Sequence, residues 1–395
     1  MIRNLVILCK VVDNYGDIGV CYRLTKAILD YIEEFPRFKD TKILLVCDNL
    51  QSFAKICTDI NPETNYSVVK YKNTYFSVFN WNIDKTDDKW RINFFFEETP
   101  PHVVLECFQC GRPDWLENLL FDKAAPQSQV INLEYLTAEK YADDFHCLQS
   151  LTRSSNVKKV NFMPGFTEKT GGLIQNKDFT QLLTFSRQLG LDFPKNKRAF
   201  WILFFTYDKN LNYEIQALNK FSRYLADSRN PKPGNIIVKD TTNISSVIKS
   251  RTKIKKSFAY EAVGFVPQET FDLRLCSYDF LFVRGEDSLA RACLIGKPFV
   301  WQAYPQSDNY QLVKVTALLE LLKPHFIPED FALLEKFWII YNTPEDEDKS
   351  EKENLLYQIL INYEKYLSGF KKFSEKLQKN GELTHNLLTF ISKIV

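Results

Sequence analysis

Residues 5–24 constrain the fold of this chain more than any other stretch. Residues 5–12 form an almost continuous apolar run of strand length, a polar turn follows at 13–17, and apolar residues then recur at helical spacing. A strand, a tight turn and a helix at the start of a chain are typical of an open α/β sheet, in which ligands bind outside the carboxyl ends of the strands. We therefore expect this turn to lie in a binding cleft, where it contributes two carboxylates, Asp13 and Asp17.

Length and composition indicate a folded protein with more than one domain. The chain has 395 residues, of which 45% are hydrophobic and 14% are aromatic, which is enough for sizeable cores. A formal net charge of +2 gives no argument for a nucleic-acid or membrane partner. No apolar stretch reaches the roughly 20 residues that span a bilayer. We expect a soluble, cytoplasmic protein.

The cysteines and histidines leave carboxylates as the candidate catalysts. Nine cysteines are scattered along the chain, and several, such as Cys9 and Cys47, lie in apolar runs as small core residues. Cys107 and Cys110 have the spacing of a zinc or redox half-site, but no second pair matches them, so we expect neither a metal site nor a redox role. With four histidines in the whole chain, histidine acid–base chemistry is disfavoured.

Strands alternate with helices in both halves of the chain, which predicts two doubly wound, Rossmann-like α/β domains facing across a cleft. The clearest strands are expected at residues 42–48, 103–108, 129–135, 199–205, 235–238 and 279–283. The predicted domains are residues 1–185 and 186–372, with a C-terminal helix at about 373–395 that packs back on the first domain.

Other segments give less regular patterns. Residues 66–71 and 94–97 are weaker strand candidates, and residues 50–60 are expected to form a helix. Towards the C-terminus, helices are expected at 354–370 and 373–394.

A second acidic turn, Arg-Gly-Glu-Asp-Ser at 284–288, follows a predicted strand in the second half. The Arg284 guanidinium and the backbone N–H groups of the next helix are suited to a diphosphate. A turn closed by an internal salt bridge is the alternative, just as Asp17 could merely cap its helix. Two such turns in opposite halves favour a cleft with a nucleotide diphosphate at one wall and an acceptor at the other.

Aromatic residues precede this second turn. Phe265, Gln268 and Phe271 lie in a strand-to-helix connection, where the rings could stack on a base and the amide could bind its edge. The alternative is that both phenylalanines belong to the core. Tyr304 lies in a similar position after the next strand.

Six stretches together resemble one family, the protein-arginine rhamnosyltransferases that modify bacterial elongation factor P (the EarP family). The stretches are VVDNYGDIGV (11–20), LEYLTAE (133–139), MPGFTEKTGGL (163–173), FVPQETFD (265–272), FVRGEDSLARA (282–292) and GKPFVWQAYPQ (296–306). The order of DNYGDIG followed by VRGEDS is specific.

The resemblance implies a GT-B glycosyltransferase that inverts the anomeric configuration and needs neither a metal nor another cofactor. It implies transfer of L-rhamnose from dTDP-β-L-rhamnose to one arginine of elongation factor P, which activates that factor for rescue of ribosomes stalled at polyproline. The first domain would bind the acceptor and the second the nucleotide sugar.

The family pattern also implies roles for individual residues. Asp17 is the expected general base, Asp13 would orient the guanidinium or the loop, and Glu286 is the third catalytic candidate. The expected nucleotide-sugar-binding residues are Asn14, Tyr15, Gly16, Phe205, Tyr207, Phe265, Gln268, Phe271, Arg284, Asp287, Ser288 and Tyr304. The chain departs from the pattern at Gln302 and Ala303, and its Asp308 has no assigned role.

An arginine acceptor would explain the carboxylates. A guanidinium stays protonated and delocalised at neutral pH, so it is a poor nucleophile. Carboxylates can grip it, hold one nitrogen towards the anomeric carbon and accept its proton. Arg284 and backbone N–H groups would stabilise the charge on the leaving diphosphate.

Two other interpretations stay open. One is a GT-B enzyme with another sugar nucleotide or acceptor, which would need no acidic turn for an arginine. The other is a non-catalytic protein that binds a nucleotide sugar or a translation factor, against which the presence of Asp13, Asp17 and Glu286 argues.

Overall fold

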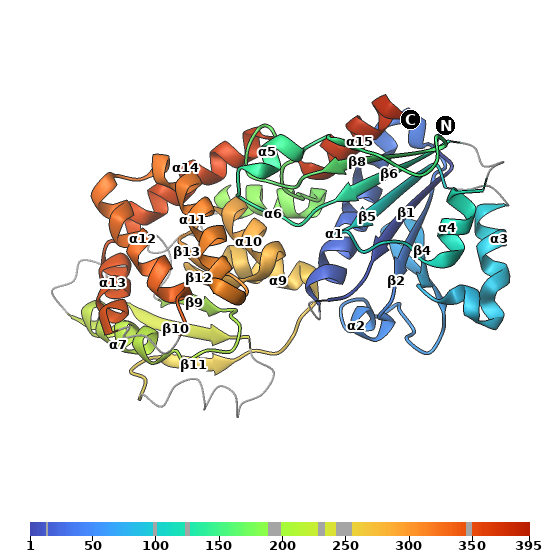
Figure 1. The fold of residues 1–395 in the computed structure, drawn as a ribbon. Coiled ribbons are helices and arrows are strands. Elements are labelled where there is room, and N and C mark those ends of the chain that lie inside the picture. Colours follow the sequence, from blue (N-terminus) through green and yellow to red (C-terminus); the bar gives the residue numbers. More distant parts are fainter. Residues whose placement is uncertain are drawn as a thin grey trace. The chain divides into compact units, whose positions relative to one another are not determined.

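The computed structural model describes residues 1–12, 15–97, 101–122, 127–188, 199–227, 234–241, 255–344 and 350–395 (Figure 1). The chain divides into two compact units: unit 1 comprises Met1–Lys177 and Asn380–Val395, and unit 2 comprises Asp178–Lys379. The expected boundary after residue 185 falls inside the helix Lys177–Gln188, and the division instead lies at the first residue of that helix.

Unit 1 is built on an eight-stranded sheet. Its strands are β1 (Asn4–Cys9), β2 (Lys42–Cys47), β3 (Tyr66–Tyr71), β4 (Thr74–Asn80), β5 (Val103–Cys107), β6 (Ser128–Leu133), β7 (Gln149–Ser150) and β8 (Val157–Phe162). Their order is β3-β4-β2-β1-β5-β6-β8-β7. Only β3 and β7, at the two edges, run antiparallel to their neighbours. The central strands are apolar on both faces because helices cover both sides of a parallel sheet.

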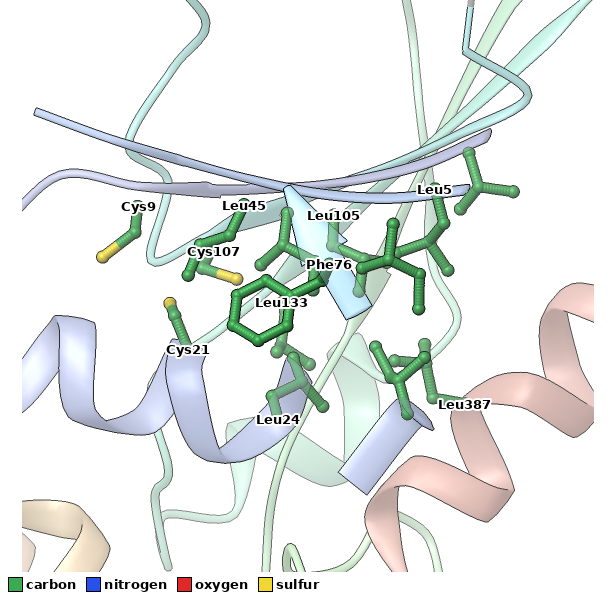
Figure 2. Close-up of a cluster of buried hydrophobic side chains, with 14 of the residues drawn as sticks. Leu5, Cys9, Cys21, Leu24, Leu45, Phe76, Leu105, Cys107, Leu133 and Leu387 are labelled. Atoms are coloured by element: carbon green, nitrogen blue, oxygen red, sulfur yellow. The ribbon is translucent and has the colours of Figure 1, made fainter. Parts of the chain in front are cut away.

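The helices of unit 1 cover the two faces of this sheet. They are α1 (Gly16–Tyr31), α2 (Leu50–Ala54), α3 (Trp90–Phe96), α4 (Asp114–Leu120), α5 (Tyr141–Phe145) and α15 (Leu383–Ile394), with 3-10 helices at Ile32–Glu34, Pro36–Phe38, Ile83–Lys85 and Asp87–Lys89. On one face, Leu24 of α1 and Leu387 of α15 pack under Leu5 of β1 (Figure 2). On the other face, Val6 of β1 lies in a cluster with Trp115 of α4.

Unit 2 is built on a five-stranded parallel sheet of order β11-β10-β9-β12-β13. Its strands are β9 (Ala199–Phe204), β10 (Asn235–Asp240), β11 (Ala259–Ala262), β12 (Phe280–Arg284) and β13 (Phe299–Gln302). Its helices are α6 (Lys177–Gln188), α7 (Asn212–Ala226), α9 (Gln268–Ser277), α10 (Gly285–Ile295), α11 (Tyr310–Leu322), α12 (Pro328–Asn342), α13 (Ser350–Ile361) and α14 (Tyr363–Lys379), with 3-10 helices at Ser307–Asn309 and Lys323–His325.

Several expected elements differ from the structure. Residues 94–97 are not a strand, because α3 includes Phe94 to Phe96. The helix expected over 50–60 ends at Ala54. The two helices expected between 354 and 394 are three, α13, α14 and α15, and the break before α15 contains Gly381, whose φ of +87° suits glycine.

The loop of the MPGFTEKTGGL stretch holds α15 in unit 1. The Leu383 N–H donates to the Leu173 carbonyl at 2.9 Å. The Gln175 N–H donates to the Glu382 carboxylate, also at 2.9 Å. The Asn386 side chain donates to the Gly171 carbonyl at 3.0 Å. This stretch therefore has a structural role, anchoring the C-terminal helix. Among the residues described, no helix combines the length and apolar character needed to cross a bilayer.

Candidate functional site

The predicted site residues fall into two groups, one in each unit. In unit 1, Asp17 lies in the first turn of α1, directly after β1, and only 3% of it is exposed. The Val12 N–H donates to its Oδ2 at 2.7 Å, and the Tyr135 hydroxyl donates to its Oδ1 at 3.2 Å. The capping position of α1 is Tyr15, so Asp17 is not the N-cap residue of this helix. The positive end of the helix dipole favours a carboxylate at this position.

The other predicted residues of this turn lie on either side of the start of α1. Gly16 is exposed and begins the helix. The ring of Tyr15 is half-buried, and the Nζ atom of Lys55 lies 5.7 Å from its centroid. Asp13 and Asn14 lie outside the described residues.

Tyr135, which we did not predict, follows β6 and reaches Asp17 because β5 alone separates β6 from β1 in the sheet. Its ring stacks on Phe108, with centroids 4.3 Å apart and planes inclined by 15°. Its presence in the LEYLTAE stretch was the signal that could have identified it.

Four buried thiols, Cys9, Cys21, Cys47 and Cys107, form a cluster beneath the turn, and Figure 2 shows Cys9, Cys21 and Cys107. Hydrogen bonds from Cys21 and Cys47 lower the pKa of Cys9, whereas burial raises the pKa of Cys21. Cys110 points elsewhere, since its Sγ lies 3.4 Å from the Gly111 carbonyl oxygen. In the described ranges, no three His, Cys, Asp or Glu side chains are arranged to hold a metal ion. The thiols act as packing residues under the turn.

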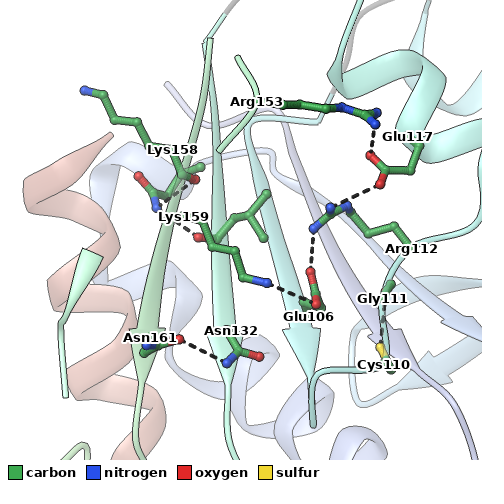
Figure 3. Close-up of polar contacts among 12 residues, drawn as sticks. Glu106, Cys110, Gly111, Arg112, Glu117, Asn132, Arg153, Lys158, Lys159 and Asn161 are labelled. Atoms are coloured by element: carbon green, nitrogen blue, oxygen red, sulfur yellow. Dashed lines mark hydrogen bonds and ion pairs between the residues drawn. The ribbon is translucent and has the colours of Figure 1, made fainter. Parts of the chain in front are cut away.

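Glu106 of β5 is a second buried carboxylate of unit 1, but cations occupy both of its oxygens (Figure 3). Arg112 Nη1 lies 2.5 Å from Oε2, and Lys159 Nζ lies 3.2 Å from Oε1. Arg112 also pairs with Glu117, which in turn pairs with Arg153. This pairing indicates a structural role and leaves Asp17 as the better candidate base of unit 1.

In unit 2, five of the predicted residues form one continuous chain of contacts. The guanidinium carbon of Arg284, at the end of β12, lies 4.8 Å from the ring centroid of Phe205 and 4.9 Å from that of Tyr207. Phe271 meets Phe205 edge to face at 4.9 Å. Tyr304 meets Tyr207 in the same way at 5.2 Å. The ends of β9, β12 and β13 and the start of α9 thus bring these side chains together.

The exposure of this group argues against a core role. Tyr304 is 59% exposed, Phe265 is 49% exposed and Phe271 is half-buried. The alternative that both phenylalanines belong to the core is therefore wrong. Gln268 begins α9, one turn before Phe271.

The start of α10 has features that would suit an anion. Arg284 is extended, and Gly285 has a φ of +67°, which favours glycine. The Ser288 hydroxyl donates to the Arg284 carbonyl, and this hydrogen bond stabilises the turn. Glu286 and Asp287 are half-buried in the first turn of α10. The backbone N–H groups of this turn begin a helix, where anions bind favourably.

Further residues support this group and were not predicted. Arg284 Nη1 donates to the Thr206 carbonyl at 3.1 Å, and the Tyr207 N–H donates to Gln302 Oε1 at 2.9 Å. Arg291 of α10 and Asp272 of α9 are both buried, with Nε and Oδ1 3.7 Å apart. This ion pair ties the two helices that carry the site. Gln302, Asp272 and Arg291 all lie in stretches that carry the resemblance.

Comparisons with known proteins agree on one family. The family model for the Elongation-Factor P (EF-P) rhamnosyltransferase EarP matches residues 5–392. A protein-arginine rhamnosyltransferase of Shewanella oneidensis is 30% identical over 350 residues, which are 82% of each chain. One of Neisseria meningitidis is 30% identical over 334 residues, 82% of this chain and 80% of the relative. One of Pseudomonas aeruginosa is 28% identical over 355 residues, 85% and 86% of the two chains.

Solved structures show the fold. The structure that gives the basis for EarP-mediated arginine glycosylation of translation elongation factor EF-P aligns with a TM-score of 0.54 and 18% identity over 99% of both chains. The spinosyn rhamnosyltransferase SpnG, solved with spinosyn aglycone, aligns with a TM-score of 0.50 and 11% identity over 98% of this chain and 99% of its own. These are GT-B glycosyltransferases, and the expected GT-B fold is confirmed.

Proposed function

Because the chain belongs to the EarP family of elongation factor P rhamnosyltransferases, we propose that it transfers L-rhamnose from dTDP-β-L-rhamnose to one arginine of translation elongation factor P. It is an enzyme of the protein-arginine rhamnosyltransferase class, as the resemblance of its six stretches implies. We further propose that the reaction takes place in the cytoplasm, inverts the anomeric carbon, needs no metal or other cofactor, and activates the factor for ribosomes stalled at polyproline.

The observation that best supports an arginine acceptor is the buried Asp17 carboxylate, held by two donors at the start of α1. In the proposed step, one guanidinium nitrogen attacks the anomeric carbon of rhamnose. The new N–C bond forms as the bond from that carbon to the β-phosphate oxygen breaks, and dTDP leaves with the electron pair. Asp17 accepts the proton that the nitrogen loses, and Asp13 orients the guanidinium or the loop. Attack opposite the leaving group converts the β- to the α-anomer.

The donor side of the proposal rests on the aromatic group of unit 2. Phe271 and Phe265 offer exposed ring surface for the thymine base, and Gln268 offers an amide for its edge. The diphosphate would lie at the start of α10, against the backbone of Asp287 and Ser288, with Tyr304 and Arg284 beside it. Glu286 stays the third catalytic candidate, and Tyr15, Gly16 and Asn14 stay candidates for the sugar end of the donor.

A transfer assay tests this function. The purified chain is incubated with dTDP-β-L-rhamnose, elongation factor P and EDTA, and the factor is examined by intact mass and fragment mapping. We expect a gain of one deoxyhexose on one arginine, with an α-linkage by NMR. A lysine variant of that arginine serves as the control acceptor.

Other outcomes would contradict the proposal in different ways. Transfer from another sugar nucleotide or to another acceptor would support a different GT-B activity. Binding of dTDP-rhamnose or of the factor with no transfer would support a non-catalytic role. Loss of transfer on adding EDTA alone would overturn metal independence.

A further inference from the structure

We propose that Tyr135 is a positioning residue that holds the Asp17 carboxylate in the orientation needed for proton transfer. The inference rests on the proposed function, in which Asp17 is the general base. It assigns to the LEYLTAE stretch a part in the reaction.

The two oxygens of Asp17 are held from two directions. The Val12 N–H, from the end of the preceding segment, donates to Oδ2 at 2.7 Å. The Tyr135 hydroxyl, from a segment 118 residues away along the chain, donates to Oδ1 at 3.2 Å. The terminal torsion of an aspartate side chain has no sharp preference of its own. Donors to both oxygens therefore restrict the plane of the carboxylate.

Tyr135 is itself held in place by its ring. The ring stacks on Phe108 at 4.3 Å, and Phe108 follows β5, the strand between β1 and β6. Phe108 and Gln109 have φ values of +60° and +53°, which non-glycine residues rarely adopt. The Phe108 N–H donates to the Leu133 carbonyl at 2.8 Å, which joins this turn to the end of β6.

Polar contacts join the same two strand ends. The Gln109 side chain donates to Glu134 Oε1, and the Asn132 side chain donates to the same oxygen at 2.6 Å. A strained turn that is tied in this way to the next strand is typical of a functional site. This turn therefore gives the Tyr135 ring a rigid support.

The hydroxyl of Tyr135 also suits the acceptor. A guanidinium has five N–H donors and no acceptor, so it can donate to the Asp17 carboxylate while the Tyr135 hydroxyl donates to Oδ1 of the same carboxylate. At 37% exposure, Tyr135 is accessible to an incoming acceptor.

The test is Tyr135→Phe, which removes the hydroxyl and keeps the stacked ring. We expect kcat for transfer to elongation factor P to fall about tenfold or more, the effect of losing one hydrogen bond to a charged group. KM for the factor, dTDP affinity and melting temperature should stay within error. Tyr75→Phe, at an exposed position near the start of β4 and so at the opposite end of the strands, is the matched control and should match the wild type.

A double-mutant cycle separates positioning from a structural role. In the Asp17→Asn background, Tyr135→Phe should cause no further loss of the residual rate, because the carboxylate that it positions is gone. Phe108→Leu, which keeps the hydroxyl and removes the stacked ring, should lower kcat by a smaller factor than Tyr135→Phe.

Three results would overturn the inference. If Tyr135→Phe turned over at the wild-type kcat, Tyr135 would have no positioning role. If Tyr135→Phe lowered kcat by the same factor in the wild-type and in the Asp17→Asn backgrounds, Tyr135 would act independently of Asp17. If the wild-type chain itself gave no deoxyhexose on the factor, the proposed function would fail, and the role of Tyr135 with it. The intact mass of the wild-type reaction distinguishes this last case from the first two.

Discussion

Replacing Lys352 by methionine is expected to destabilise unit 2 by about 3–5 kcal/mol. Lys352 of α13 pairs with Glu214 of α7, with Nζ and Oε1 2.8 Å apart and side chains that are 2% and 0% exposed. Methionine fills nearly the same volume but leaves the Glu214 carboxylate buried with no opposite charge. Because neither side chain reaches solvent, no reduction for screening applies.

Thermal unfolding followed by circular dichroism, with hydrogen exchange to assign the transition to unit 2, measures the effect. At about 2–4 °C for each kcal/mol in a domain of about 200 residues, we expect a shift of roughly 10 °C. The double variant Glu214→Leu/Lys352→Met should recover most of the loss, because an apolar pair can replace a buried ion pair.

An exposed ion pair between α12 and α13 provides the control. Lys336 Nζ lies 2.5 Å from Glu351 Oε1, with side chains 53% and 51% exposed. Lys336→Met should change the free energy of unfolding by less than about 1 kcal/mol. Equal shifts for Lys352→Met and Lys336→Met would refute the argument from burial.

Three further predictions concern both units. Asp17→Asn should lower transfer about a hundredfold or more with unchanged dTDP affinity, measured by mass spectrometry and calorimetry; normal turnover would rule out Asp17 as the base. Phe271→Ala should weaken dTDP binding by about 1–3 kcal/mol in calorimetry, and an unchanged Kd would assign the ring to packing alone. Glu106→Gln should lower the stability of unit 1 by about 1–3 kcal/mol, because Arg112 and Lys159 each lose their ion pair with Glu106. An unchanged melting temperature of unit 1 would contradict this last prediction.

Sequence periodicity predicted the central strands well. β2 and β5 each begin at the predicted residue and end one residue before the predicted bound. This agreement arises because buried strands of a parallel sheet appear in the sequence as unbroken apolar runs. The prediction of a strand at residues 94–97 was wrong. Their phenylalanines have high strand propensity, but α3 packs Phe96 against the sheet, and tertiary packing overrides that propensity.

The candidate site could be predicted where its residues follow neighbouring strands. Phe205 comes directly after β9, and Arg284 is the last residue of β12. Because these two strands pair in the sheet, the two side chains meet at one edge. The contact of Tyr135 with Asp17 could not be predicted in this way. It depends on the order β1-β5-β6, which local patterns do not contain.

The division of the chain has a consequence for how the protein is made. Leu387 and Ile391 of α15 belong to the main core of unit 1. A hydrogen bond from the Leu383 N–H to the Leu173 carbonyl joins the ends of the two segments that make up this unit. Unit 2 is therefore an insertion, and a version of unit 1 with residue 177 linked to residue 380 would keep its whole core. During translation, the eight strands of unit 1 are synthesised first, but the core on one face of their sheet stays incomplete until α15 emerges. Unit 2 is synthesised later and is the first unit that can finish folding.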